Sequence, residues 1–161
     1  MAYGSDSAFT AWLALNGLTL PAGAPEAAIL RQRGSQYVDG VYGSRFWGVP
    51  TGSFAQERAW PRTGAKAYGQ DIPDSITPVA VEQASYAAAH HEAFFPGSLS
   101  VAASHAGAVK REKVDVLEVE YVAGSGDVVA DATVRLTAVE GLLAPFLRSE
   151  TPAGLGLWAV G

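Results

Sequence analysis

The chain contains no cysteine, which excludes disulfides and thiolate metal sites. It also lacks long apolar runs, since none approaches the roughly 18 residues that a membrane-spanning helix needs. Neither a basic region nor an apolar stretch, the marks of a secretory signal, occurs at the N-terminus. We therefore expect a soluble protein without a membrane partner that folds in the reducing cytoplasm of its host.

Positive charge is scarce as well. The chain has 11 Lys and Arg against 16 Asp and Glu, which gives a formal net charge of -5. Because DNA is bound mainly by neutralising its phosphates, this balance disfavours a dedicated nucleic-acid binder. An acidic surface would instead suit a protein past which double-stranded DNA slides without sticking.

Apolar residues are plentiful, at 48% of the 161 residues, so the chain can bury one ordinary core. No internal repeat or long linker is visible. We predict one domain over residues 1–148, with a tail over 149–161. The tail is too rich in glycine and alanine to fold alone, but three apolar residues could anchor it to a partner: Leu155, Leu157 and Trp158.

Four segments show the apolar spacing of helices. The second contains Gly34 and Gly40, which predict either a shorter helix or a close approach of another backbone, and we favour the close approach. In the fourth, Thr137 and Glu140 form a capping-box pattern, and Pro145 should kink or shorten the helix. The helices are expected at about Ser5–Asn16, from Pro25 toward Phe46, from Thr77 to Phe94, and from Thr137 to Arg148.

Two further regions complete the expected fold. The spacing of Gly and Pro over residues 48–74 forbids a long regular element, yet Phe54, Trp60 and Tyr68 suggest a loop packed onto the core. Residues 109–122 read as one strand, with a turn at 124–127 and a return strand to 134, so a projecting hairpin is predicted over about 109–134. The apolar parity changes between Val116 and Val119, which predicts either a bulge or a strand whose two halves face different partners. The fold class is therefore mainly α: a small four-helix bundle with an inserted β-hairpin and an extended C-terminal tail.

Catalytic and metal-binding patterns are absent from the sequence. His90 and His91 are adjacent, which is the wrong spacing for two ligands on one helix face, and His105 has no local partner. None of the common nucleophile, phosphate-loop or zinc-protease motifs occurs. We expect no enzymatic activity and no cofactor or metal.

The local excess of positive charge at residues 110–113 has two interpretations. It could touch phosphate, but an acid interrupts it and more acids follow, so a salt-bridged strand at a subunit boundary is the more economical interpretation. The resulting candidates for a subunit interface are Lys110, Arg111, Lys113, Glu118 and Glu120.

Two motifs resemble a known family. The loop motif Trp60-Pro61-Arg62 and the strand at 109–114 leading to 118–121, in this order among the helices, are similar to phage head–tail adaptor (head-completion) proteins. Members of that family are also labelled DnaT-like single-stranded DNA-binding proteins. The resemblance covers about Ser5 to Arg148.

This resemblance implies a structural protein of the bacteriophage virion, located in the neck between head and tail. Such an adaptor is a small helical bundle that forms a homo-oligomeric connector ring, expected to be a dodecamer, on the portal protein. It extends the DNA channel and receives a stopper or tail-terminator protein on its other face. Leu155, Leu157 and Trp158 would be the portal-binding residues.

The DnaT-like label suggests a different function, single-stranded DNA binding. That alternative would use Trp60, Arg62 and the segment from Lys110 to Lys113. It predicts an affinity that falls steeply with salt.

Overall fold

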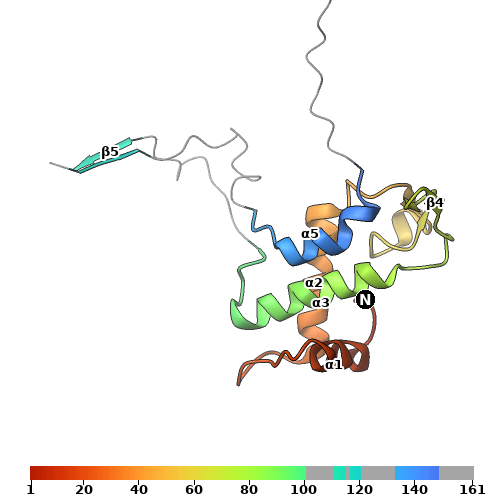
Figure 1. The fold of residues 1–161 in the computed structure, drawn as a ribbon, viewed down its shortest axis with the longest axis horizontal. Coiled ribbons are helices and arrows are strands. Elements are labelled where there is room, and N and C mark those ends of the chain that lie inside the picture. Colours follow the sequence, from red (N-terminus) through yellow and green to blue (C-terminus); the bar gives the residue numbers. More distant parts are fainter. Residues whose placement is uncertain (101–110, 115–116, 121–132, 149–161) are drawn as a thin grey trace, which may run out of the picture.

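The computed structural model describes residues 1–100, 111–114, 117–120 and 133–148. Two sixteen-residue helices, α2 (Ala27–Tyr42) and α3 (Val79–Phe94), cross at its centre (Figure 1). The shorter α1 (Asp6–Leu15) packs against both, and α5 (Thr137–Leu143) packs against α3. Among these described residues, no helix is long and apolar enough to cross a membrane.

The first and third helices begin and end close to where their sequence patterns predict. Ser5 caps α1, since its hydroxyl oxygen accepts a hydrogen bond from the Ala8 amide at 3.1 Å. Pro78 precedes α3 directly, and its missing N–H costs nothing at a helix start. The second helix is shorter than predicted, because it ends at Tyr42 and does not reach Phe46.

The crossing of α2 and α3 depends on Gly34. A Cβ atom at this position would lie 2.2 Å from the Ser85 carbonyl oxygen and 2.8 Å from the Ala89 nitrogen, both on α3. The predicted close approach is confirmed here. It is wrong at Gly40, where a Cβ would meet nothing within 4 Å.

The buried apolar residues form two clusters on the helix pair. The smaller joins α1 to α2 and α3, and it contains the stacked rings of Phe9 and Trp12 at 6.5 Å together with Tyr86. The larger joins α2 and α3 to α5 and to the loop after α2, where the Trp60 ring lies between Phe46, at 5.5 Å, and Phe146, at 6.0 Å.

The chain between α2 and α3 forms only very short elements. These are β1 (Val49–Pro50) paired antiparallel with β2 (Arg62–Thr63), β3 (Lys66–Ala67) paired antiparallel with β4 (Gln70–Asp71), and the 3-10 helix η1 (Ser53–Ala55). The prediction that no long element forms is confirmed. Trp60 is buried as predicted, but Phe54 and Tyr68 are exposed, so the prediction that they pack down is wrong.

A hairpin is present, but its register differs from the prediction. Strand β5 (Arg111–Val114) pairs antiparallel with β6 (Leu117–Glu120), and Val114 lies opposite Leu117. The chain therefore reverses inside the segment that was predicted to be one strand. This reversal, and not a bulge, explains the change in apolar parity. The predicted return strand runs to residue 134, and its residues up to 132 lie outside the described residues; residues 133 and 134 are described and form no strand.

The C-terminal helix begins at Thr137 as predicted but without the predicted cap, and it is shortened at Pro145 as predicted. Leu136 occupies the cap position and makes no side-chain cap, so the Thr137 and Glu140 capping box is not formed. At Pro145 the α-helix has already given way to the 3-10 helix η3 (Ala144–Phe146), as the ring of a proline requires.

The four-helix bundle is therefore wrong as the fold class. The described residues form a mixed structure of short helices and small two-stranded sheets. With seven residues, α5 is too short to line the full length of α3, and α2 and α3 cross instead of running side by side (Figure 1). Sequence periodicity predicts that a helix forms but does not give its angle to its neighbours.

Candidate functional site

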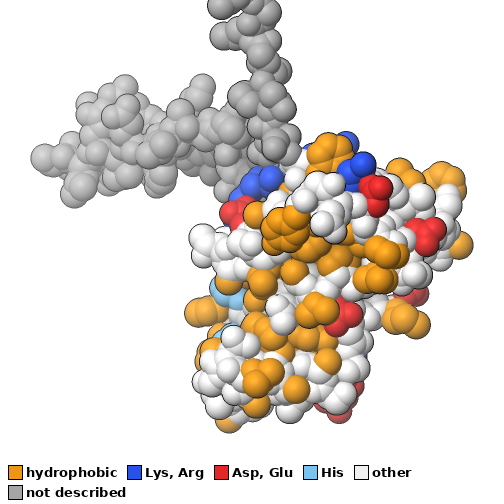
Figure 2. All heavy atoms as spheres, turned by 45° about the vertical axis from the view of Figure 1, so that its right-hand side comes forward, with side chains coloured by type: hydrophobic (Ala, Val, Ile, Leu, Met, Phe, Trp, Pro, Cys, Tyr) orange, Lys and Arg blue, Asp and Glu red, His pale blue; other side chains and the backbone are white. Residues whose placement is uncertain are grey.

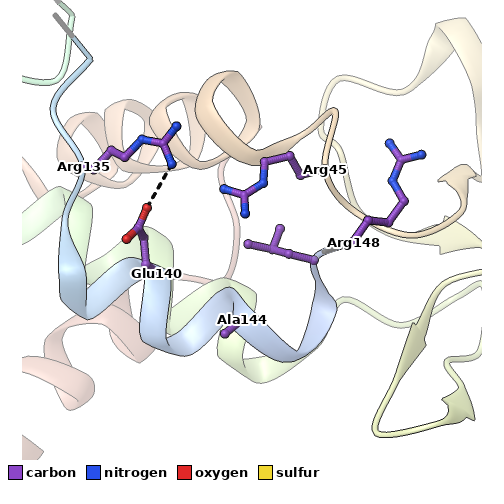
Figure 3. Close-up of a pocket in the computed structure, with 6 residues that line it drawn as sticks. Arg45, Arg135, Glu140, Ala144 and Arg148 are labelled. Carbon is purple, nitrogen blue, oxygen red and sulfur yellow. Dashed lines mark hydrogen bonds and ion pairs between the residues drawn. The ribbon is translucent and has the colours of Figure 1, made fainter. Parts of the chain in front are cut away.

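A hollow lined by three arginines lies where the chain after α2 meets the end of α5. Its volume is about 350 Å³, and its walls are Arg45, Arg135, Glu140, Ala144, Leu147 and Arg148 (Figure 3). Among the described residues that line it, three are arginines and one is a glutamate, so this lining carries more positive than negative side chains on an acidic protein. Figure 2 shows Lys and Arg side chains gathered at the upper edge of the molecule.

Backbone pairing brings Arg45 and Arg148 together. Phe46 forms an antiparallel bridge with Leu147, and the Arg148 amide donates to the Arg45 carbonyl at 2.8 Å. The Arg148 guanidinium also donates to the Ser44 carbonyl. Residues separated by about a hundred positions in the chain are thereby fixed as neighbours.

The three side chains differ in how firmly they are held. The Arg45 guanidinium lies 5.9 Å from the centre of the Tyr42 ring, within the range of a cation–π contact. Arg135 is paired with Glu140 at 3.4 Å, and about half of its side chain is exposed. In Figure 3 Arg45 points toward this ion pair, whereas Arg148 points away from it.

Tyr42 also responds electrostatically to this charged site. Burial raises the pKa of its hydroxyl above the ordinary value, and Tyr37 and then the Glu140 carboxylate raise it further. The hydroxyl stays neutral at physiological pH. It supplies an aromatic face to Arg45 but no negative charge that would cancel it.

The motif residues Trp60 and Arg62 do not reach the surface. Trp60 is 2% exposed and Arg62 is 5% exposed. The Arg62 guanidinium donates to three backbone carbonyls, those of Trp47 at 2.8 Å, Ala59 at 3.0 Å and Gly48 at 2.6 Å. Burial lowers the pKa of Arg62 below its ordinary value. This motif ties the loop to the core, and it leaves neither side chain available to stack or bind a nucleotide.

The comparison with protein families matches residues 2–159 to the family described as "Putative DnaT-like ssDNA binding protein". The chain belongs to this family. No curated protein and no solved structure matches it.

The family match covers nearly the whole chain, including the predicted interface segment at 110–120. Strand register there places Arg111 opposite Glu120 and Lys113 opposite Glu118, so residues of opposite charge face each other across the hairpin. Lys110 and the predicted portal-binding residues Leu155, Leu157 and Trp158 lie outside the described residues. None of the described interface candidates, which are Arg111, Lys113, Glu118 and Glu120, lines the arginine hollow.

The histidines give no sign of a metal centre. The His90 ring lies 5.0 Å from that of Phe94, and the His91 ring lies 5.0 Å from that of Phe95. Across the described ranges, no group of three or more potential ligands comes together. His105 falls in the part of the chain that is not described.

A larger hollow, of about 650 Å³, lies beside α2 and the end of α3, and it lacks the charge excess of the arginine hollow. The buried Glu92 carboxylate on its wall accepts from Arg33 at 3.1 Å and from the Gly97 amide at 2.8 Å. These contacts fold the chain after α3 back onto the helix. One cation faces one anion here, so we assign it a structural role.

Sequence reasoning missed the residues of the arginine hollow. Arg45 follows the second helix and Arg135 precedes the last one, and no local motif marks either. Their only shared signal is that each lies just outside a helix, where side chains reach solvent. The pairing of residues 45–47 with 146–148 brings Arg45 beside Arg148, and periodicity cannot reveal such long-range pairing.

Proposed function

We propose that this protein binds single-stranded DNA through its phosphates, with the arginine hollow as the contact. The observation that carries this proposal is the gathering of Arg45, Arg135 and Arg148 around one opening in a protein of net charge -5. The family description supports it. The proposal replaces Trp60 and Arg62, which are buried, with Arg135 and Arg148, which are exposed, and with the half-buried Arg45.

Arginine is suited to this task because its planar guanidinium donates two parallel hydrogen bonds to phosphate oxygens. Binding would require Arg135 to exchange its partner Glu140 for a phosphate. That exchange costs little, since an ion pair this exposed is worth about 1 kcal/mol or less. Glu140 would weaken binding by repelling the incoming phosphate.

The small number of arginines sets the expected strength. With up to three phosphates neutralised, the logarithm of affinity should fall with the logarithm of salt with a slope of about -2. The acidic remainder of the protein adds repulsion. We therefore expect weak binding without sequence preference that is visible mainly at low salt.

A titration of a fluorescent oligothymidine at several salt concentrations tests this function. Arg148→Ala should lower affinity and reduce the salt slope by about 0.7. Glu140→Gln should raise affinity. Arg33→Ala, in the charge-balanced second hollow, serves as the matched control and should leave the slope unchanged. No binding by the native protein at low salt would refute the proposal.

A second candidate is the role of a structural head–tail adaptor, in which the protein forms a ring on a phage portal. The observation that favours it is the burial of Trp60 and Arg62. The motif on which the resemblance to adaptors is based is therefore part of the core. It supports a scaffold shared with adaptors and does not support contact with a nucleotide. A net charge of -5 also suits a channel that DNA must leave freely.

Mass measurement of the purified protein, alone and mixed with a portal, tests the adaptor role. A ring or a stable complex with the portal would support it, and so would detection of the protein in mature virions. A monomer that neither assembles nor co-sediments with the portal would contradict it. This result is independent of the oligonucleotide titration, so the two candidates are tested separately.

A further inference from the structure

An exposed tyrosine stands at the tip of the β3–β4 hairpin. Tyr68 has φ 52° and Gly69 has φ 76°, so both turn residues are left-handed. Glycine adopts this conformation freely, but for a bulky side chain it is strained. Tyr68 is nevertheless 84% exposed. Burial does not compensate for the strain.

No contact among the described residues explains the position of this ring. Its hydroxyl has no hydrogen-bond partner there, and the ring stacks on no other aromatic side chain of the described part. A strained residue that contributes nothing to the packing of the fold suggests a function. At this site tyrosine adds an exposed aromatic face and a hydroxyl that glycine would lack.

The hairpin and the arginine hollow share one supporting segment. Strand β3 packs on η3, and η3 contributes Ala144 to the wall of the hollow and leads directly to Arg148. Lys66, at the base of the same hairpin, is 57% exposed and pairs with Asp71 at 3.1 Å. An aromatic face and the cationic opening are thus carried by adjoining elements.

We propose that Tyr68 is a stacking platform for an unpaired base of the strand whose phosphates enter the arginine hollow. The inference rests on the proposed single-stranded DNA binding and adds the part of the ligand that the arginines do not recognise. Aromatic stacking accepts any base, because every base presents a π-face. Duplex DNA, whose bases are stacked internally, would not use this residue.

The test compares an oligothymidine with an abasic oligomer of the same length, which carries the phosphates without the bases. Tyr68→Gly should weaken binding of the oligothymidine by about 5- to 100-fold and leave binding of the abasic oligomer unchanged. Tyr68→Phe should bind both as the native protein does. Phe54→Ala, which removes a fully exposed aromatic ring from η1, is the matched control and should change neither affinity.

A second readout separates stacking from a folding role. Since glycine relieves the left-handed strain, Tyr68→Gly should raise Tm by about 2–4 °C while it weakens binding. A merely structural tyrosine would lose stability on the same substitution. Higher Tm together with base-dependent loss of affinity would support the proposal.

Three results would overturn it. If native binding depends on Arg148 but Tyr68→Gly binds the oligothymidine as well as the native protein, the stacking role fails and the proposed function stands. Equal losses for the two oligomers would show that Tyr68 acts without bases. If Tyr68→Gly instead disrupts self-association and leaves oligothymidine affinity intact, the tip is a protein contact.

Discussion

The crossing of α2 and α3 and the loop region over residues 49–74 are ordered by different means. At the crossing, small residues let two backbones approach until Gly34 has no room for a side chain. In the loop region the elements are two or three residues long, and polar side chains satisfy backbone groups that these short elements leave unpaired. Arg62 alone satisfies three backbone carbonyls there.

This difference shows two ways of burying a backbone. A helix satisfies its own hydrogen bonds and needs only a complementary surface, so packing decides its position. An irregular loop leaves carbonyls unpaired, and burying them requires donors from side chains. The predictions that follow probe the crossing and the loop region in turn, from the largest expected effect to the smallest.

The largest effect is expected at the centre of the crossing. Gly34→Ala would place a Cβ 2.2 Å from the Ser85 carbonyl oxygen, so the two helices must move apart. We expect the free energy of unfolding to fall by about 3 kcal/mol or more. Urea denaturation followed by circular dichroism measures it. Native-like stability would show that the helices can separate without cost.

The corresponding test of the loop region removes its polar anchor. Arg62→Ala should lower the free energy of unfolding by about 2–3 kcal/mol, because three buried carbonyls lose a charged donor. Arg62→Lys should recover only part of this lost stability, since an ammonium group cannot reproduce the planar fork of N–H donors of a guanidinium. If Arg62→Ala lowers the free energy of unfolding no more than a surface substitution does, Arg62 does not anchor the loop region, and the contrast between the two regions fails.

The third substitution uses the other glycine of α2 as an internal control. Gly40 is exposed, and a Cβ there meets nothing within 4 Å. Gly40→Ala should therefore raise the free energy of unfolding by about 0.5–1 kcal/mol, through helix propensity alone. A fall in the free energy of unfolding at Gly34 together with a rise at Gly40 would separate the effect of backbone crowding from that of helix propensity. A loss of stability at Gly40 would mean that a partner occupies this face.

The smallest expected effect concerns the link between α2 and the loop. Asp39 accepts a hydrogen bond from the Tyr3 hydroxyl at 2.5 Å and is paired with Arg58 at 3.0 Å. Burial nevertheless raises the pKa of Asp39 above its ordinary value, against these favourable contacts. The carboxyl group of Asp39 therefore stays protonated to a higher pH in the folded protein than in the unfolded chain.

The sign of the pH dependence follows from this. The stabilisation linked to the Asp39 proton is complete below the unfolded pKa, about 4, and is lost as pH rises through the raised folded value. Because Asp39→Asn removes this titration, its stability relative to the native protein should improve from pH 4 to pH 7. Parallel denaturation series at the two pH values measure the change. If the stability of Asp39→Asn relative to the native protein instead falls from pH 4 to pH 7, folding lowers the pKa of Asp39 and does not raise it.

Much of the helical part of this protein can be predicted from sequence. Ser5 and Pro78 mark helix starts through local chemistry, and Pro145 limits the last helix for the same reason. Gly34 indicated a close approach because a glycine inside a helix is otherwise costly. By contrast, the same reasoning failed at Gly40, since a glycine does not say whether a neighbour is present.

The roles of Arg62 and Tyr68 could not be predicted in this way. Arg62 has the sequence appearance of a surface cation in a polar loop, and only the surrounding carbonyls make it a core residue. Tyr68 looked like an anchor for the loop, and the left-handed turn with Gly69 turns it outward. In both cases the conformation of the surrounding backbone decides whether the side chain is buried or exposed, and the residue type alone does not predict that conformation.

The sequence by itself determined where the main helices form, that an apolar core exists and that positive charge is scarce, because these depend on composition and on contacts within a few residues. Tertiary structure alone decided that α2 and α3 cross, that residues 45–47 pair with 146–148, and that three arginines meet at one hollow. Such pairings join distant parts of the chain, and their geometry depends on side-chain packing at both ends at once.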